Sequence, residues 1–325
     1  MSRLGMWMLV AAALLAAPFH QAQGADEFGL TVRDSSFDVT LNGQPFTSLH
    51  NDLGPKPILF PIIGPTSKPL TRSYPMEDVA GETKDHPHHR SLWFTHGDVN
   101  GVDFWAEKEG NGKIEHEAFT EITRGHALAI TEACRWVAAD KTVHVQDVRT
   151  YGFALAPDGS RIIDFDITLK APAEKPVKFG DTKEGTFGVR VPSVLDVDKK
   201  LGGKITNDKG ETDAKAWGQP AAWVDYSGVI DGEKVGITIM NHPTSFRYPT
   251  TWHVRTYGLF AANPFGLGSF PSKLKEDGSV TLAPGKSLTL RYRVLLHKGD
   301  ATDAKLAEAF KAYSQVEKPK VEQPE

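Results

Sequence analysis

Residues 128–169 read LAITEACRWVAADKTVHVQDVRTYGFALAPDGSRIIDFDITL, and apolar side chains alternate with polar ones along most of this stretch. A period of two places successive side chains on opposite faces of a β-strand. The alternation breaks at residues 140–141 and again at Pro157-Asp158-Gly159, which are typical turn residues. The stretch therefore predicts three consecutive antiparallel strands, each with one face turned towards a core.

The same pattern continues on both sides of this stretch. Residues 37–46 alternate around Asn42-Gly43, which is a strong hairpin signal. Many short strands with little helix are typical of an all-β fold. We expect a single antiparallel β-sandwich domain over residues 25–300. The further strands that the alternation predicts lie at residues 222–230, 235–240, 279–282 and 287–297.

Three segments differ from the strand pattern. Residues 1–24 contain Arg3, then an apolar run, then small residues, which is the layout of a secretory signal peptide. We therefore expect export to the periplasm or the cell exterior. Residues 301–325 predict one helix, at 303–313, followed by a charged, Pro-rich and disordered tail. The polar, Gly-rich residues 199–218 predict a long surface excursion.

The composition argues against several kinds of partner. The formal net charge is -4 and no basic run occurs, so neither nucleic acid nor an anionic membrane is an expected partner. After the signal segment, no stretch approaches the roughly 18 apolar residues that a transmembrane helix needs. Cys134 is the only cysteine, so no intrachain disulfide can form. Its position in an apolar-alternating run predicts a buried structural thiol.

Residues 85–90, DHPHHR, are the densest group of chemically active side chains in the sequence. Imidazole titrates near neutrality, transfers protons and binds metals. If this segment is extended, His86 and His88 point to one side and His89 to the other. One of these histidines could transfer protons, oriented by the aspartate of the segment or by Asp103.

Two alternatives for the histidine segment stay open at this point. His86 and His88 could hold a divalent metal, with His96 or His242 as a further ligand, since zinc takes three or four such ligands. The histidines could instead only satisfy backbone groups of their own loop. A divalent metal is the one cofactor that the residues suggest.

Three other segments combine polar and aromatic residues. Arg72 follows a Pro-rich and Gly-rich stretch and offers a planar cation suited to a carboxylate or a diol. Glu184 lies in KEGTFGVR, residues 183–190, where a carboxylate among aromatic residues can act as an acid or a base. Residues 240–266 are dense in His, Arg, Asn and aromatic residues at the end of a predicted strand.

Four motifs together resemble the PmoA-like family of exported bacterial proteins. They are HPHHRS at residues 86–91, NGVDFW at 100–105, KEG at 183–185 and NPFG at 263–266. The resemblance covers most of residues 28–297. Members of that family look like mutarotase-type β-sandwich proteins and tend to be encoded among carbohydrate-degradation genes. The resemblance therefore implies a mutarotase-like sandwich and a sugar ligand.

The residues favour a carbohydrate-active enzyme that acts on a sugar or uronate by histidine and glutamate acid–base chemistry. The reaction would be of the glycoside hydrolase, lyase or epimerase type. The predicted catalytic residues are His88, His89, Glu184, His242 and Asp103. The predicted substrate-binding residues are Arg72, Arg90, Trp93, Asn100, Trp105, Arg190, Trp252, Arg255 and Asn263.

Two other functions are compatible with the same residues. A non-catalytic carbohydrate-binding protein would keep the tryptophans and arginines, but it would not need so many titratable groups together. A metal-dependent oxygenase would use His86, His88 and a further ligand.

Overall fold

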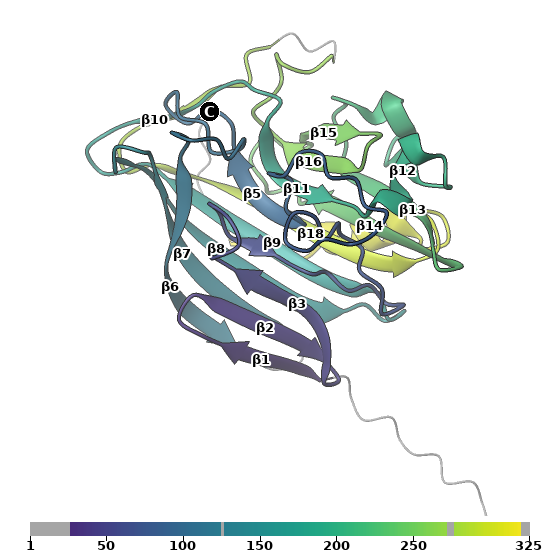
Figure 1. The fold of residues 1–325 in the computed structure, drawn as a ribbon. Helices are drawn as coiled ribbons and strands as arrows, with labels where there is room; N and C mark the ends of the chain where they lie inside the picture. Colours follow the sequence, from purple (N-terminus) through teal and green to yellow (C-terminus); the bar gives the residue numbers. More distant parts are fainter. Residues whose placement is uncertain (1–26, 125–126, 272–275, 320–325) are drawn as a thin grey trace, which may run out of the picture.

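The computed structural model describes residues 27–124, 127–271 and 276–319, and within them two eight-stranded antiparallel sheets pack face to face (Figure 1). The first sheet contains β1 (Phe28–Val32), β2 (Ser36–Leu41), β3 (Gln44–His50), β4 (Ile58–Leu59), β5 (Leu92–His96), β11 (Gly185–Arg190), β16 (Leu259–Asn263) and β15 (Thr251–Arg255). The second contains β12 (Lys204–Asn207), β13 (Trp223–Ile230), β14 (Glu233–Asn241), β18 (Ser287–Lys298), β9 (Arg161–Lys170), β8 (Val143–Leu155), β7 (Leu128–Val137) and β6 (Lys113–Thr123). The predicted all-β antiparallel sandwich is confirmed.

The remaining elements of the described chain are short. A small ladder joins β10 (Val177–Phe179) to β17 (Val280–Leu282). Three 3-10 turns, η1 (Ser193–Leu195), η2 (Val197–Lys199) and η3 (Asp213–Ala216), lie between β11 and β13. The surface excursion predicted for residues 199–218 is therefore partly wrong, because β12 lies inside it and pairs with β13.

The strands and the first hairpin form where the alternation predicts them. β7, β8 and β9 pair in sequence order, and β9 pairs in turn with β18. Asn42 and Gly43 both have positive φ, 52° and 74°, which a two-residue turn between β2 and β3 requires. The prediction of a hairpin at this point is confirmed.

The core lies between the two sheets. Phe165 of β9 and Phe187 of β11 stack across the interface with ring centroids 4.6 Å apart, and Phe187 also stacks on Tyr292 of β18. Cys134 of β7 lies fully buried in the same core, and burial raises the pKa of its thiol. The buried structural thiol expected at this position is confirmed.

Each sheet also has an outer face, turned away from the core. On β15, Trp252 and Val254 belong to the core, so His253 and Arg255 lie on the outer face. On β18, Val294 belongs to the core, whereas Leu295 packs in a separate cluster on the opposite face. The two outer faces differ in what covers them.

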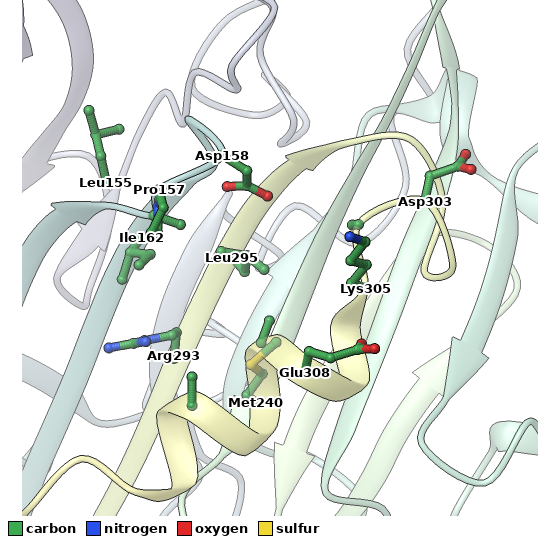
Figure 2. Close-up of a pocket in the computed structure, with 14 residues that line it drawn as sticks. Leu155, Pro157, Asp158, Ile162, Met240, Arg293, Leu295, Asp303, Lys305 and Glu308 are labelled. Atoms are coloured by element: carbon green, nitrogen blue, oxygen red, sulfur yellow. The ribbon is translucent and has the colours of Figure 1, made fainter.

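The C-terminal helix α1 (Leu306–Ser314) covers part of the second sheet's outer face. Leu306 and Tyr313 are buried there against Met240 and Leu295, and the helix predicted for residues 303–313 is confirmed. An apolar groove of about 660 Å³ remains between α1 and the strands β9, β14 and β18 (Figure 2). No helix of the described chain is long and apolar enough to cross a membrane.

The disordered tail predicted after the helix is partly wrong. Val316 and Pro319 accept hydrogen bonds through their carbonyl oxygens from His242 and Arg291, and the Lys318 ammonium pairs with Asp166 at 2.9 Å. These contacts fasten residues 316–319 to the second sheet. The last residues of the predicted tail and the predicted signal peptide, residues 1–24, lie outside the described residues.

Candidate functional site

The histidine segment forms a tight turn on the outer face of the first sheet. The His89 backbone N–H donates to the His86 carbonyl oxygen at 2.9 Å, with Pro87 at the second position of the turn. Proline favours that position because its φ is fixed near the value the turn needs. The rings of His86 and His89 stack at 4.8 Å, and His88 meets His89 edge-on at 4.4 Å. The extended, alternating arrangement predicted for these residues is wrong.

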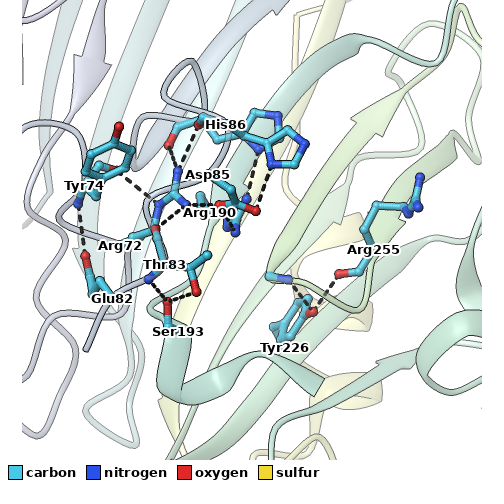
Figure 3. A network of polar contacts seen from close by, with 12 residues as sticks. Arg72, Tyr74, Glu82, Thr83, Asp85, His86, Arg190, Ser193, Tyr226 and Arg255 are labelled. Carbon is cyan, nitrogen blue, oxygen red and sulfur yellow. Dashed lines mark hydrogen bonds and ion pairs between the residues drawn. The ribbon is translucent and has the colours of Figure 1, made fainter. Parts of the chain in front are cut away.

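A buried ion-pair network holds this turn in place (Figure 3). Asp85 Oδ1 accepts hydrogen bonds from Arg72 at 2.6 Å and from Arg190 at 2.8 Å, while its Oδ2 lies 2.9 Å from His86 Nδ1. Arg72 also donates to the backbone oxygens of His86 and His89. Burial opposes ionisation of Asp85, but Arg190, His86 and Arg72 outweigh it and lower the pKa of the carboxyl.

Arg72 and Arg190 therefore support the site from behind. Both side chains are fully buried, and their guanidinium groups face Asp85. Neither residue lines the cavity beside the turn. The structure thus corrects the prediction that these two arginines bind substrate, because their charge is already paired within the protein.

A cavity of about 360 Å³ lies beside the histidine turn. Its volume falls in the range of small-molecule sites. The histidine turn, the loop before Lys113, the start of β11 and the end of β15 meet there. The lining residues are mostly titratable or aromatic: His86, His88, His89, Trp105, Ala106, Lys108, Lys183, Glu184, His253, Arg255 and Tyr257.

Glu184 and His253 place a carboxylate beside an imidazole on the wall of this cavity. The Glu184 Oε2 atom lies 3.8 Å from His253 Nδ1, and the other carboxylate oxygen pairs with Lys183. His253 is only 2% exposed, and neither of its ring nitrogens has a hydrogen-bond partner among the described residues. A buried polar group without a partner is costly. This histidine therefore has unused hydrogen-bonding capacity beside the cavity.

Three histidines of the cavity, His88, His89 and His253, are neutral at pH 7. Burial, together with the nearby Lys183 and Arg255, lowers the pKa of His253 to about 3. Burial, with Lys56 and His86, lowers the pKa of His88 to about 4. Burial and the neighbouring His88 likewise hold the pKa of His89 well below its ordinary value. A neutral imidazole can donate one hydrogen bond and accept another.

Cations and aromatic rings complete the cavity wall. Arg255 lies over the ring of Trp217 at 4.8 Å and over that of Tyr257 at 5.4 Å, which fixes its position. Its carbonyl oxygen accepts a hydrogen bond from Tyr226 at 2.7 Å (Figure 3). With Lys108 and Lys183, the wall carries three cations against the single carboxylate of Glu184. The cavity therefore suits a ligand with negative charge.

Three predicted polar residues do not line the cavity and instead hydrogen-bond to backbone groups. Asp103 accepts hydrogen bonds from the N–H groups of Trp105 and Ala106, at 2.6 and 3.1 Å. Asn100 has a φ of 53° and accepts the Lys178 N–H at 2.7 Å. Asn263 donates to the carbonyl oxygen of Thr182 at 2.9 Å, which positions the segment that carries Glu184. The structure gives these residues structural rather than substrate contacts, and so corrects their predicted roles.

Of the predicted tryptophans, Trp105 lines the cavity and two others do not. Trp93 is buried beneath His89, with ring centroids 5.5 Å apart. Trp252 points into the core and donates to the Ala221 carbonyl oxygen at 2.9 Å. Since both rings are buried, neither can stack on a ligand, and their predicted substrate-binding role is corrected.

Arg90 and His242 also lie apart from the cavity. Arg90 pairs with Glu107 through its Nε atom, at 3.0 and 2.9 Å from the two carboxylate oxygens. His242 hydrogen-bonds Thr244 at 2.8 Å and meets the Tyr313 ring of α1. His242 therefore belongs to the outer face of the second sheet, which corrects its prediction as a catalytic partner of the histidine turn.

The predicted metal site does not assemble. His86 and His88 are neighbours, with ring centroids 5.7 Å apart. His96, proposed as a further ligand, hydrogen-bonds the Gly180 carbonyl oxygen at 2.8 Å instead. Within the described ranges, no group of three or more His, Cys, Asp or Glu side chains is arranged to hold a metal ion.

Sequence reasoning missed four polar side chains of the cavity: Lys108, Lys183, His253 and Tyr257. For His253 a signal was available. Arg255 was predicted to bind substrate, and a strand places residues two apart on the same face. His253 and Arg255 therefore had to point the same way once β15 was recognised as a strand.

The chain can also be compared with known proteins. The curated proteins include no match to it. A GalM/aldose epimerase homologue from C. elegans has a TM-score of 0.34 and 9% identity, over 85% of this chain and 100% of that one. A galactose mutarotase related enzyme from Lactobacillus acidophilus has a TM-score of 0.36 and 12% identity, over 83% of this chain and 97% of that one. At these scores neither structure bears on the chemistry of the cavity.

A family model described as a family of unknown function, DUF6807, matches residues 36–311. The match takes in every strand of both sheets except β1, most of α1 and every residue that lines the cavity. The chain belongs to the family of unknown function DUF6807.

Proposed function

We propose that this protein is a carbohydrate-active enzyme that moves a proton on a sugar acid bound beside Glu184 and His253. One observation carries the proposal: a carboxylate and a buried imidazole with unpartnered nitrogens lie 3.8 Å apart on the wall of a cavity of about 360 Å³. Titratable side chains with perturbed pKa values and unused hydrogen-bonding capacity are typical of functional sites. The proposal includes export, which rests on residues 1–24, and the PmoA-like resemblance, both of which stay predictions.

The protonation states suggest a different role in the reaction for each of Glu184 and His253. With a pKa of about 3, His253 stays neutral at pH 7 and is a weak base. A neutral imidazole can instead donate a hydrogen bond to an oxygen that gains charge, while a nearby carboxylate removes the proton. In our mechanism Glu184 takes the proton from the carbon next to the substrate carboxylate. His253 donates its N–H to the carboxylate oxygen that becomes more negative.

The surrounding side chains would orient the substrate. Lys108, Lys183 and Arg255 provide the positive charge that a uronate carboxylate needs. The half-buried ring of Tyr257 offers an apolar surface for a sugar ring. If a proton from water adds to the other face of that carbon, the product is an epimer, and Glu184 afterwards releases its proton to water. If instead the C–O bond at the neighbouring carbon breaks, the electron pair leaves with the oxygen, that oxygen takes the proton from Glu184, and the reaction is that of a lyase.

Hydrolysis by two carboxylates has less support. Most glycosidases need one carboxyl group on each side of the bond. Among the described residues that line the cavity, Glu184 is the one carboxylate. Asp85 is paired with two arginines, and Asp103 is occupied by backbone N–H groups. The geometry therefore favours proton abstraction over hydrolysis.

The test is a substrate screen in D₂O with paired variants. The protein is incubated with neutral sugars and uronates, and NMR follows both product formation and deuterium uptake next to the carboxylate. We expect turnover with uronates in the wild type. In Glu184→Gln we expect turnover to fall by about 10²- to 10⁴-fold, because the base is removed while the shape is kept. Binding should survive.

Glu174→Gln is the matched control, since Glu174 is an exposed glutamate outside the cavity. It should behave like the wild type. If Glu184→Gln turned over substrate at the wild-type rate, the proposed mechanism would be wrong. If the wild type bound uronates without deuterium uptake or product, the protein would be a sugar-binding protein and not an enzyme.

A further inference from the structure

A second hollow of about 350 Å³ adjoins the cavity. Lys108 lines both spaces, so they meet at this residue. The second hollow is bordered by Arg90, Asn111 and Lys113, which lie between the histidine turn and the start of β6. We propose that the two hollows form consecutive subsites for an acidic oligosaccharide, with one charged sugar unit in each. This inference rests on the proposed function, because it takes the first subsite to hold a uronate.

The wall between the two hollows is held by buried ion pairs. Glu107 accepts hydrogen bonds from Arg90, at 2.8 to 3.0 Å, and pairs with the buried Lys56. Lys56 also donates to the His88 carbonyl oxygen at 3.1 Å. The same network therefore ties the second hollow to the histidine turn. A fixed spacing between two subsites needs such a rigid connection.

Charge in the two hollows favours an anion in each. Together they are lined by five cationic side chains and two carboxylates, Glu107 and Glu184, in a chain whose net charge is -4. Lys108 and Lys113 are exposed, and neither pairs with a carboxylate in the described part of the chain. Like charges gathered in a hollow raise the local concentration of an opposite charge. A neutral glycan would form no ion pair with this excess of cationic side chains.

An unpartnered polar group in the second hollow points to a ligand independently of charge. The side-chain nitrogen of Asn111 is buried and has no hydrogen-bond partner among the described residues. An amide nitrogen can donate two hydrogen bonds, and a sugar hydroxyl or carboxylate can accept them. The second hollow therefore offers the same combination as the first, a cation beside an unsatisfied donor.

The experiment measures affinity against chain length by calorimetry. The probes are the monomer and the dimer of galacturonate, glucuronate and mannuronate, with neutral disaccharides alongside. We expect an acidic dimer to bind about tenfold more tightly than its monomer, and this gain should shrink at high salt. Lys113→Gln should weaken dimer binding about fivefold and leave monomer binding unchanged. Lys286→Gln, an exposed lysine away from both hollows, is the matched control.

The outcomes separate this inference from the proposed function. If the monomer binds and the dimer binds no more tightly, the second subsite does not exist, while the proposed function stands. Equal weakening of monomer and dimer by Lys113→Gln would also overturn the second subsite. If no uronate binds at all, both proposals fall. Lys113 is exposed, so thermal unfolding of the variant should match that of the wild type.

Discussion

The two outer faces of the sandwich carry hollows of opposite character. The hollow on the first sheet measures about 360 Å³ and gathers four histidines, one carboxylate and three cations. The hollow under α1 on the second sheet is larger, about 660 Å³, and is lined mainly by Leu, Ile, Ala and Met side chains. Its Arg293 is already paired with Asp164 at 2.7 Å. Volume alone therefore does not mark the functional face, since a site also needs converging polar groups that are free to bind.

The largest expected effect comes from breaking the support of the polar face. Asp85→Asn removes the negative charge between Arg72 and Arg190, both of which are fully buried. Uncompensated buried charge is costly, and we expect a loss of about 3 kcal/mol in the free energy of unfolding. This is the low end of the usual range because Asp85 itself is 32% exposed. Denaturant unfolding measures the loss. Uronate affinity should fall as well, because the histidine turn loses its anchor.

A stable Asp85→Asn protein with unchanged affinity would show that the turn does not depend on this network. Asp78→Asn is the matched control, because Asp78 lies at the surface and pairs with Lys84 in solvent. An exposed pair of this kind contributes little to stability.

A smaller effect is expected from the apolar face. Met240 is fully buried and borders the groove under α1 (Figure 2). Met240→Ala should lower the free energy of unfolding by about 2 kcal/mol, the low end for such a truncation, because the side chain already borders open space. Uronate affinity should not change. If calorimetry showed affinity falling in step with stability, the two faces would be coupled through the sandwich, and the contrast between them would fail.

The smallest expected effect is the pH dependence of stability that His253 on the polar face causes. The pKa of His253 is about 3 in the folded protein and its ordinary value is 6.5. Below pH 6.5 the unfolded chain binds a proton that the folded chain does not, so stability falls as the pH falls. Between pH 8 and pH 6 this histidine should cost the wild type about 1 kcal/mol of stability.

His253→Asn should remove that share of the pH dependence, whereas Met240→Ala should keep it. Thermal or denaturant unfolding of the three proteins at pH 8, 7 and 6 provides the comparison. Equal slopes in wild type and His253→Asn would show that this histidine is not held neutral by the fold.

The fold could be predicted from the sequence because its signals are local. The period-two pattern of residues 128–169 and the Asn42-Gly43 turn specify strands and a hairpin through backbone geometry alone. The apolar face of α1 is local in the same way. A tail contact such as that between Lys318 and Asp166 joins residues 152 positions apart. A local sequence pattern cannot predict such a contact.

The site was predictable only in part, for the same reason. The histidine turn and Glu184 stood out by composition, and both line the cavity. Whether an arginine binds substrate or pairs with a buried aspartate depends on contacts across the fold, as the pairs of Asp85 with Arg72 and Arg190 show. Residue type cannot distinguish these two uses. Pro87, however, was a local signal for a turn, and it should have outweighed the assumption of an extended segment.

The single buried cysteine gives this protein a built-in reporter. Cys134 is the only thiol in the chain, it is fully enclosed between the sheets, and burial raises its pKa. A thiol reagent can reach it only when β7 separates from the opposite sheet. Burial also disfavours the thiolate, which is the form that reacts. The labelling rate therefore counts openings of the whole sandwich without any engineered probe. Ligands that bind only the folded state would slow that rate.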